Sequence, residues 1–207
     1  MFPVQINPAN YSFTVVGGGE IANHKVKNLL RFGIKPLVIS PHFHPDLLTL
    51  EKDGLIELKQ KFAEWSDLID AHFIILVTND EQANDRLAKQ AVAAGKLVVH
   101  AANPALGNAQ LPAVLRRGKL QISVATDGAS PTLAKQIRDD LAEQYDEKYE
   151  SYLAFLAEVR QFVKVHVQER SERNKWLKEA ATPLYLEQAE ARLILWKRLY
   201  HRNNVEY

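Results

Sequence analysis

The chain has 207 residues, of which 46% are hydrophobic and 25% are charged, so it can form one large globular domain or two smaller ones. Its 26 basic and 25 acidic side chains give a net charge of +1, which predicts no general attraction to nucleic acid or to a membrane surface. The absence of cysteine excludes disulfides, thiolate metal sites and cysteine nucleophiles. Without a membrane-length apolar run or a secretory-type leader pattern, the sequence predicts a cytoplasmic protein.

An apolar segment near the N-terminus leads directly into a glycine-rich turn. The predicted strand Phe13–Val16 is followed by a Gly-x-Gly-x-x-Ala pattern that comprises Gly17, Gly18, Gly19, Glu20, Ile21 and Ala22. In such a pattern the first glycine permits a tight turn, the second lets the backbone approach a pyrophosphate, and the small last residue lets the helix pack against the strand. Because the N–H groups at the start of the helix attract anions, the turn predicts a dinucleotide site rather than a purely structural loop.

A helix and a second strand, Pro36–Ser40, complete a unit of the βαβ type. Dinucleotide sites usually carry Asp or Glu at the end of this strand to hold the adenosine ribose. Here the residues are Ser40, Pro41 and His42, which we assign to the adenosine end of the site with a modest preference for NAD over NADP. His42 and His44 have a spacing compatible with a metal ion, but no third ligand is visible nearby, so no metal is assigned.

The alternation of strands and helices continues, which predicts an α/β fold. Further strands are expected over residues 55–58, 73–77 and 96–100, with a helix between the last two. Strands in this order build a parallel Rossmann-like sheet, whose ligands bind beyond the carboxyl ends of the strands.

Polar residues follow the fourth and fifth predicted strands and therefore fall near that ligand-binding edge. Thr78 and Asn79 follow the fourth strand and are assigned to cofactor binding. His100 and Asn103 lie at the end of the fifth strand and are the candidates for catalysis. Asparagine has no useful pKa, and His100 faces the same side as residue 102 only if the strand stays regular.

The pattern changes after Pro112. A half-buried strand over 120–125 leads into a turn and then a helix, for which Ser130 is a good N-cap and Pro131 a suitable first residue. From there the pattern is helical to the C-terminus, with an interruption at Pro183 that predicts at least three helices. An apolar stripe in this part is typical of a packed core or a dimer seam.

Four segments of the chain together carry a resemblance to a known family. They are VVGGGEIANHKVKNLL (15–30), LVTND (76–80), LPAVLRRGKLQISVATDGASPTLAKQIRDDL (111–141) and ERSERNKWLKE (169–179). The third is the most specific, because Arg-Arg-Gly-x-Leu, a short strand and a Gly-x-Ser-Pro helix start seldom occur together. The chain resembles the precorrin-2 dehydrogenase / sirohydrochlorin ferrochelatase family, the dehydrogenase module of siroheme synthase.

The resemblance implies a fold, an oligomeric state and a reaction. It implies a Rossmann-like NAD-binding domain over residues 1–112, a small dimerisation element over 113–145 and a C-terminal helical domain over 146–207, in a homodimer. The implied reaction is the oxidation of precorrin-2 to sirohydrochlorin with NAD, followed in bifunctional members by insertion of Fe²⁺ to give siroheme.

A tetrapyrrole with eight carboxylates requires hydrogen-bond donors and positive charge at its rim and an apolar cleft for its ring. Basic side chains cluster in sequence around the predicted helix start, which could itself hold a carboxylate. The expected substrate-binding residues are Arg116, Arg117, Thr126, Gly128 and Ser130. The alternative is that the basic residues form a solvated surface.

One residue departs from the family pattern. Family members commonly carry Asp two residues before the proline that follows the fifth strand, and the corresponding residue here is Ala102. Alanine can neither accept a proton nor steer a metal ion, so dehydrogenation is favoured and ferrochelation is doubtful. A non-catalytic homodimeric regulatory protein that binds NAD and a tetrapyrrole is the alternative.

Overall fold

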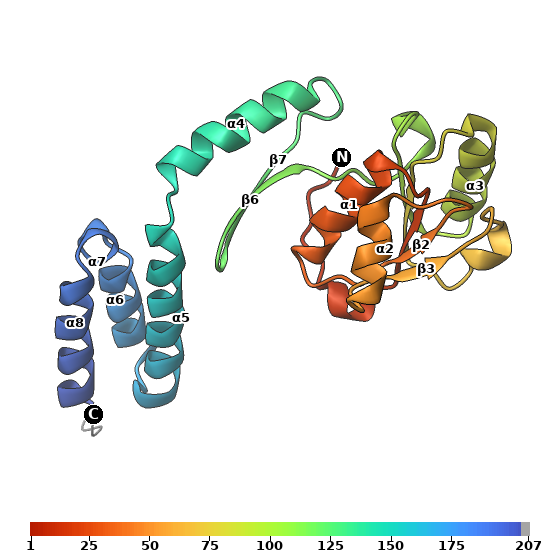
Figure 1. Ribbon diagram of the computed structural model, residues 1–207. Helices are drawn as coiled ribbons and strands as arrows, with labels where there is room; N and C mark the ends of the chain where they lie inside the picture. Colours follow the sequence, from red (N-terminus) through yellow and green to blue (C-terminus); the bar gives the residue numbers. More distant parts are fainter. Residues whose placement is uncertain (204–207) are drawn as a thin grey trace. The chain divides into compact units, whose positions relative to one another are not determined.

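The computed structural model describes residues 1–203 of the chain (Figure 1). The chain divides into two compact units, one comprising Met1–Leu111 and the other beginning at Pro112. The further division of the second unit into a dimerisation element and a helical domain stays a prediction. Residues 204–207, the end of the expected helical domain, lie outside the described residues.

The first unit is built on a five-stranded parallel sheet with the strand order β3-β2-β1-β4-β5. The strands are β1 (Phe13–Val16), β2 (Leu37–Ile39), β3 (Glu57–Lys59), β4 (Phe73–Leu76) and β5 (Leu97–His100). The chain runs outward from β1 to β3 and then returns to the other side of β1 with β4. The predicted α/β class and the parallel Rossmann-like sheet are confirmed, and the strand order reverses beside β1, where such sheets bind ligands.

Helices cover both faces of this sheet, as Figure 1 shows. They are α1 (Glu20–Leu30), α2 (Pro45–Lys52) and α3 (Glu81–Ala93), with short 3-10 turns at η1 (Pro8–Asn10), η2 (Trp65–Asp67) and η3 (Pro104–Leu106). Alternate strand residues point to opposite faces, so Val15 packs with α1 and α2 while its neighbour Val16 packs with α3. Two apolar layers therefore enclose the sheet, whose central strands β1 and β4 are fully buried.

Helix α2 is the main element of this unit that the sequence analysis did not predict. Pro45 occupies the first helical position, where its missing N–H costs nothing. The ring of His44 caps the helix by accepting a hydrogen bond from the Asp46 N–H at 3.2 Å. Leu47 is fully buried beneath the helix, and Leu50 packs against the same core, so these apolar contacts help the cap to anchor the eight residues.

The second unit starts with an antiparallel hairpin of β6 (Ala113–Arg117) and β7 (Leu120–Val124), against which α4 (Pro131–Gln144) packs. Gly118 opens the two-residue turn with a φ of +53°, which a side chain would disfavour. The element is thin: within residues 112–146, all of them described, the buried residues are Leu115 and Ala134. The predicted N-cap Ser130 and first helical residue Pro131 are confirmed.

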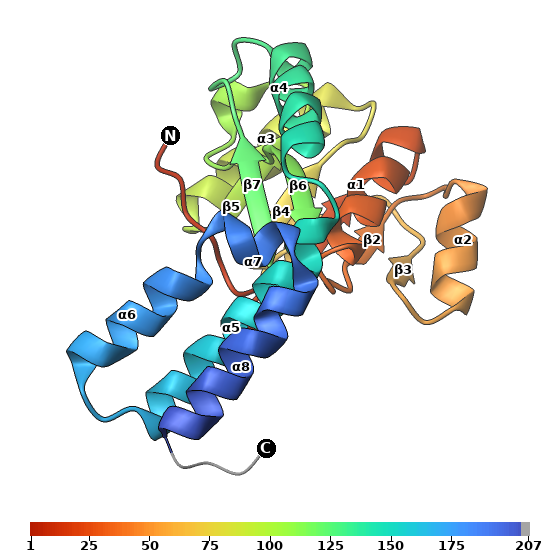
Figure 2. The ribbon, with the colours of Figure 1, turned by 90° about the vertical axis from the view of Figure 1, so that its left-hand side faces the viewer.

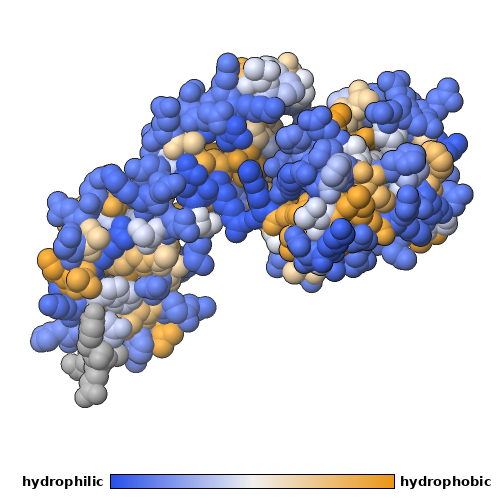
Figure 3. Space-filling model, viewed as in Figure 1, coloured by the Kyte–Doolittle hydropathy of each residue, from blue (hydrophilic) through white to orange (hydrophobic). Residues whose placement is uncertain are grey.

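The rest of this unit is helical, with α5 (Lys148–His166), α6 (Arg170–Ala180), α7 (Pro183–Glu187) and α8 (Ala189–Arg202). Figure 2 shows the long helices α5 and α8 lying alongside each other, with the short α7 at one end. Their core is aromatic, and the buried Tyr152 hydroxyl donates to the Ala180 carbonyl at 2.9 Å. Apolar residues also reach the surface of this part, as the space-filling view shows (Figure 3); Ile194 is 61% exposed.

Candidate functional site

The turn between β1 and α1 begins with a glycine whose backbone conformation excludes other residues. Gly17 has a φ of +126°, and a Cβ atom built there would lie 2.8 Å from the carbonyl oxygen of Val77. The Gly17 N–H donates to the carbonyl of Ile39 at 2.9 Å, which ties the turn to the end of β2. The first glycine is therefore required by the fold itself.

The second glycine is required by packing against the loop that follows β2. A Cβ atom on Gly18 would collide with the carbonyl oxygen of His42 and would lie 2.8 Å from the Ser40 hydroxyl oxygen. The same loop donates a hydrogen bond back, from the His44 N–H to the Gly18 carbonyl at 2.7 Å. The glycine turn and the predicted adenosine loop thus form one rigid edge.

The third glycine, Gly19, is not required by backbone conformation or by packing within the described residues. Gly19 is exposed, has an ordinary φ of −83°, and a Cβ atom built on it would meet no atom of the described residues within 4 Å. It is the N-cap of α1 and makes no side-chain capping bond, so no side chain at this position occupies the first N–H groups of the helix. A missing side chain over open helix N–H groups is what a phosphate-binding backbone requires. Ala22 is fully buried beneath it, while Ile21 is 58% exposed.

The predicted adenosine edge of the site carries no carboxylate at the end of β2. Ser40 is buried, Pro41 is half-buried and His42 is exposed. The Gln60 side chain donates to the Pro41 carbonyl at 3.1 Å, so the chain just beyond β3 supports this loop from the side.

A buried carboxylate holds that supporting segment in place. The Asp67 side chain is only 3% exposed, and its oxygens lie 2.5 Å from Lys59 Nζ and 3.0 Å from Lys61 Nζ. It also accepts a hydrogen bond from the Glu64 N–H at 2.9 Å. Burial alone would raise the pKa of Asp67, but these donors outweigh it and hold the pKa at about 2.

A second polar cluster joins α1 to α2 and was not predicted from the sequence. Asn23, which is 5% exposed, donates to Asp46 Oδ2 at 3.0 Å, and Lys27 Nζ reaches the same oxygen at 2.5 Å. The hydrogen bond from Lys27 is the main cause of the lowered pKa of Asp46. The His-Pro-Asp run at 44–46 was the available signal, because it matches a cap, a first-turn proline and a first-turn acid.

The two residues considered after β4 differ in their surroundings: Thr78 is hydrogen-bonded within the turn, whereas Asn79 is exposed. Thr78 donates from its hydroxyl to Asn84 Oδ1 at 2.8 Å, and the Asn84 amide donates back to the Thr78 carbonyl at 2.9 Å. Since Asn84 is 1% exposed, this pair holds the turn into α3. Asn79 is exposed at the same edge.

The end of β5 places the two candidate catalytic residues in different environments. His100 is 3% exposed and points towards α3, where its Nε2 lies 3.0 Å from Asp85 Oδ1. Its Nδ1 accepts the Asn103 N–H at 2.9 Å. Because the strand ends at His100 and the chain then bends, Ala102 and Asn103 are exposed instead of sharing its side. The predicted catalytic roles of His100 and Asn103 are not tested by this placement and stay predictions.

The expected substrate-binding residues of the second unit lie in the hairpin and at the start of α4. The Thr126 hydroxyl accepts the Ser130 N–H and donates to the Ser130 carbonyl, both at 3.0 Å. Ser130 Oγ caps α4 by accepting the Leu133 N–H at 3.1 Å. Both hydroxyls therefore shape the turn, whose Gly128 has a φ of +85° and open space where a side chain would be.

The two arginines of the hairpin differ in burial. Arg116 is exposed, whereas Arg117 is half-buried. The buried Nε of Arg117 has no hydrogen-bond partner within residues 1–203, although the guanidinium donates to the Arg116 carbonyl at 3.4 Å. The substrate-binding role of both arginines stays a prediction.

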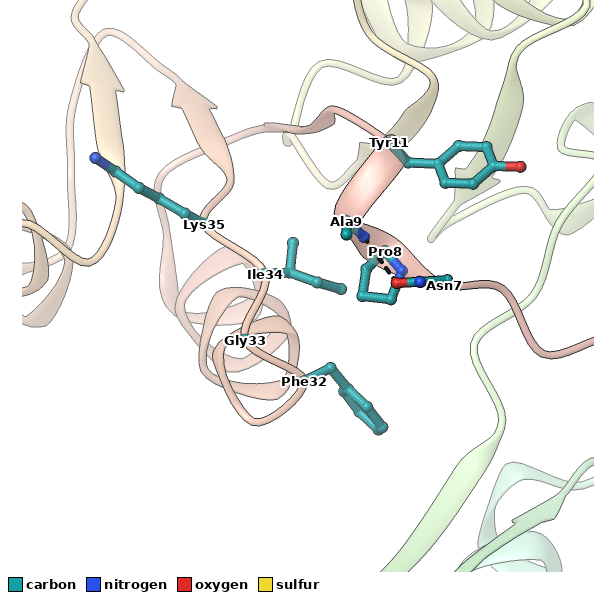
Figure 4. A pocket seen from close by; sticks show the side chains of 8 residues that line it. All are labelled: Asn7, Pro8, Ala9, Tyr11, Phe32, Gly33, Ile34 and Lys35. Atoms are coloured by element: carbon teal, nitrogen blue, oxygen red, sulfur yellow. Dashed lines mark hydrogen bonds between the residues drawn. The ribbon is translucent and has the colours of Figure 1, made fainter. Parts of the chain in front are cut away.

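A separate hollow of about 510 Å³ lies at the opposite edge of the first unit (Figure 4). It is lined by η1 with its neighbours and by the segment between α1 and β2: Asn7, Pro8, Ala9, Tyr11, Phe32, Gly33, Ile34 and Lys35. These residues precede β1 and β2, so the hollow is at the amino ends of the strands and away from the glycine turn. Within residues 1–203, no three His, Asp or Glu side chains are grouped to hold a metal ion, and no helix is long and apolar enough to cross a membrane.

A parallel sheet whose order reverses beside β1, with the glycine turn at that point, defines a dinucleotide-binding protein of the Rossmann-like class. Three family models match consecutive parts of the chain: a putative NAD(P)-binding family over residues 4–113, the central part of sirohaem biosynthesis proteins over 117–144, and the SirC C-terminal domain over 149–192. The chain belongs to the family of precorrin-2 dehydrogenases and siroheme synthases.

Individual relatives agree with this assignment. The chain is 38% identical over 160 residues to a precorrin-2 dehydrogenase of Priestia megaterium, covering 77% of this chain and 79% of that one. It is 28% identical over 146 residues to a precorrin-2 dehydrogenase of Bacillus subtilis, covering 70% and 90%. A solved structure titled SirC, precorrin-2 dehydrogenase, matches with a TM-score of 0.85 and 31% identity over 97% of this chain and 100% of that one. A siroheme synthase of Xylella fastidiosa is 28% identical over 79% of this chain, which spans 35% of its length.

Proposed function

We propose that this chain is a precorrin-2 dehydrogenase that oxidises precorrin-2 to sirohydrochlorin with NAD. The observation that carries the proposal is Gly19, whose missing side chain leaves open space over the uncapped start of α1. Relatives named precorrin-2 dehydrogenase, one of them 38% identical, support the choice of substrate. A cytoplasmic location belongs to the same proposal, because a chain without cysteine suits a reducing compartment.

The residues of the first unit fit the cofactor. In this proposal the backbone of residues 17–22 holds the pyrophosphate, residues 40–42 contact the adenosine, and Thr78 and Asn79 line the neighbouring strand end. NAD bound there supplies a hydride acceptor, and the protein supplies binding and orientation. The hydrogen bond from the His44 N–H to the Gly18 carbonyl keeps the phosphate and adenosine segments in a constant relation.

The loop after β5 limits what this protein can do with protons and metal ions. Ala102 is exposed at the carboxyl edge of the sheet but carries no group that exchanges a proton. Asn103 is the exposed polar side chain beside it and can orient a ligand without titrating. We therefore propose that dehydrogenation proceeds mainly through binding geometry and that iron insertion is weak or absent.

In this proposal the second unit carries the substrate-binding residues and the contact surface of the homodimer. Arg116 and Arg117 carry positive charge suited to the carboxylates of a tetrapyrrole, and residues 126–130 shape the neighbouring turn. A homodimer is part of the proposal because a two-stranded sheet is marginal by itself and α4 leaves Leu133 47% exposed and Ile137 36% exposed. A second copy would cover this surface.

The test follows the absorption spectrum of purified protein incubated with precorrin-2 and NAD, with and without Fe²⁺. We expect sirohydrochlorin to form only when NAD is present, and iron insertion to stay near its uncatalysed rate. No NAD-dependent change in the spectrum would refute the dehydrogenase activity. It would favour the alternative, a non-catalytic protein that binds NAD and a tetrapyrrole, for which the lack of a carboxylate at Ala102 is expected. An Ala102→Asp variant should gain iron insertion if that carboxylate is what the chain lacks.

A further inference from the structure

We propose that His100 is a positioning residue, which holds the loop 101–103 in its working conformation through one tautomer of its ring. The claim rests on the proposed dehydrogenase function, because this loop lies at the carboxyl edge where the cofactor and substrate would meet. It reassigns His100 from the proton carrier that the sequence had suggested to a support for its neighbours.

The hydrogen bonds of His100 define its tautomer. Nδ1 lies 2.9 Å from the Asn103 backbone nitrogen, which can only donate, so Nδ1 carries no proton. The ring proton is then on Nε2 and points to Asp85 Oδ1 at 3.0 Å. A backbone N–H donor on one side and a carboxylate acceptor on the other orient the ring, as carboxylate–histidine pairs commonly do.

The ring is not accessible to a substrate in this arrangement. His100 is 3% exposed, and both of its nitrogens are engaged by partners within the same unit. A proton carrier must reach the reacting atom directly or through one water. The geometry therefore points to an indirect role.

The loop that His100 holds is anchored at both ends. Ala101 donates its N–H to the Leu76 carbonyl at the end of β4, at 3.1 Å. Asn103 donates its N–H to His100, and its side chain makes no capping bond to η3, which it precedes. Between these anchors, Ala102 and the Asn103 amide are presented to solvent. Loss of the second anchor would leave Asn103 held through its carbonyl, which accepts the Leu106 N–H at 3.1 Å, so residues 102–103 would gain freedom without disturbing the glycine turn.

Two substitutions separate the roles of the two ring nitrogens. Asparagine places its Oδ1 close to the position of Nδ1 and can still accept the Asn103 N–H, whereas glutamine places its amide close to the position of Nε2 and can reach only Asp85. We expect His100→Gln to lower kcat about tenfold, the factor equivalent to one hydrogen bond of ordinary strength, with KM for NAD unchanged. We expect His100→Asn to keep kcat within about threefold of the natural chain.

Equal loss of kcat in both variants would overturn the proposal, because a proton carrier is abolished by either change. A loss confined to His100→Asn would also overturn it. The thermal midpoints of both variants are measured alongside, and a kcat difference that follows the fraction folded counts against positioning.

A measurement without substrate keeps this test independent of the proposed function. Nitrogen-15 NMR of the natural chain should show an unprotonated Nδ1 and a protonated Nε2 for His100, and the opposite tautomer would contradict the assignment. Amide hydrogen exchange at Asn103 should be faster in His100→Gln than in His100→Asn. If the natural chain shows no dehydrogenase activity while both of these results hold, the proposed function fails and the structural role of His100 stands.

Discussion

The sheet of the first unit and the hairpin of the second unit bury their apolar residues to very different extents. Strands β1 and β4 are buried along their whole length, because α1 and α2 cover one face of the sheet and α3 covers the other. The hairpin β6–β7 has α4 on it and buries a single strand residue, Leu115. The sheet of the first unit is covered by helices on both faces, whereas the hairpin, on which α4 packs, remains largely unburied.

This difference supports the proposal that the hairpin element is the part of the molecule that contacts a second copy. A sheet closed on both faces obtains its stability within one chain. A two-stranded sheet with one helix is marginal until another surface covers its apolar residues. The comparison therefore locates the proposed homodimer contact on the hairpin element and not on the cofactor-binding unit.

The largest expected effect comes from making the same substitution in both regions. Leu76→Ala removes a fully buried side chain from β4 and should cost about 4 kcal/mol of unfolding free energy. Leu115→Ala should cost about 2 kcal/mol of unfolding free energy in the monomer, because few buried residues surround Leu115 and they can move to fill part of the cavity. Urea unfolding followed region by region with hydrogen exchange separates the two units.

Protein concentration distinguishes the two leucines further. If a second copy covers the hairpin, the cost of Leu115→Ala rises with protein concentration while that of Leu76→Ala does not. The same cost for both substitutions at every concentration would contradict the comparison.

A smaller effect is expected at the glycine turn, where two adjacent glycines serve different purposes. Gly18→Ala places a methyl group against the His42 carbonyl and should cost about 1–3 kcal/mol of stability. Gly19→Ala meets no protein atom, so its stability should stay within about 1 kcal/mol of the natural chain. Its affinity for NAD should nevertheless fall at least about tenfold, or about 1.4 kcal/mol. Calorimetric titration with NAD checks this, and unchanged affinity in Gly19→Ala would argue against phosphate binding by the glycine turn.

The cap of α2 should contribute about as much as an ordinary helix cap. His44→Ala removes the acceptor for the Asp46 N–H and should cost about 1 kcal/mol, whereas His44→Asn retains an acceptor in a similar place and should cost less. The backbone N–H of residue 44, which bonds to the Gly18 carbonyl, is present in both variants, so the affinity for NAD should stay close to that of the natural chain. Thermal unfolding of the two variants measures the difference, and identical midpoints would show that the ring does not cap the helix.

An effect confined to acidic pH is expected from Asp67, the carboxylate that supports the predicted adenosine loop. The pKa of Asp67 is about 2 in the folded chain against an ordinary value of 3.8, so the unfolded chain binds a proton more readily. Its stabilising contribution is present above about pH 4 and is lost as the pH falls through about 2. Asp67→Asn should flatten the stability curve in this window, which urea unfolding at a series of pH values measures. A slope identical to that of the natural chain would place the acid sensitivity elsewhere.

The sequence by itself determined the scaffold of this protein and predicted where the cofactor binds. Apolar β-branched runs and the Gly-x-Gly-x-x-Ala turn are local signals, and they predicted the parallel sheet and the site beside β1. The start of α4 was equally local, since Ser130 and Pro131 have the chemistry of a cap and a first helical residue. The family followed from four such segments read in order.

The tertiary structure decided which side chains face the ligand edge and which support it. His100 turned inward because β5 ends there and α3 offers Asp85 from fifteen positions earlier in the chain. Asn23 and Asp46 likewise meet only because α1 and α2 pack on the same face of the sheet. Periodicity specifies the face of a residue within an element, but where an element ends and what packs against it depend on contacts between distant segments.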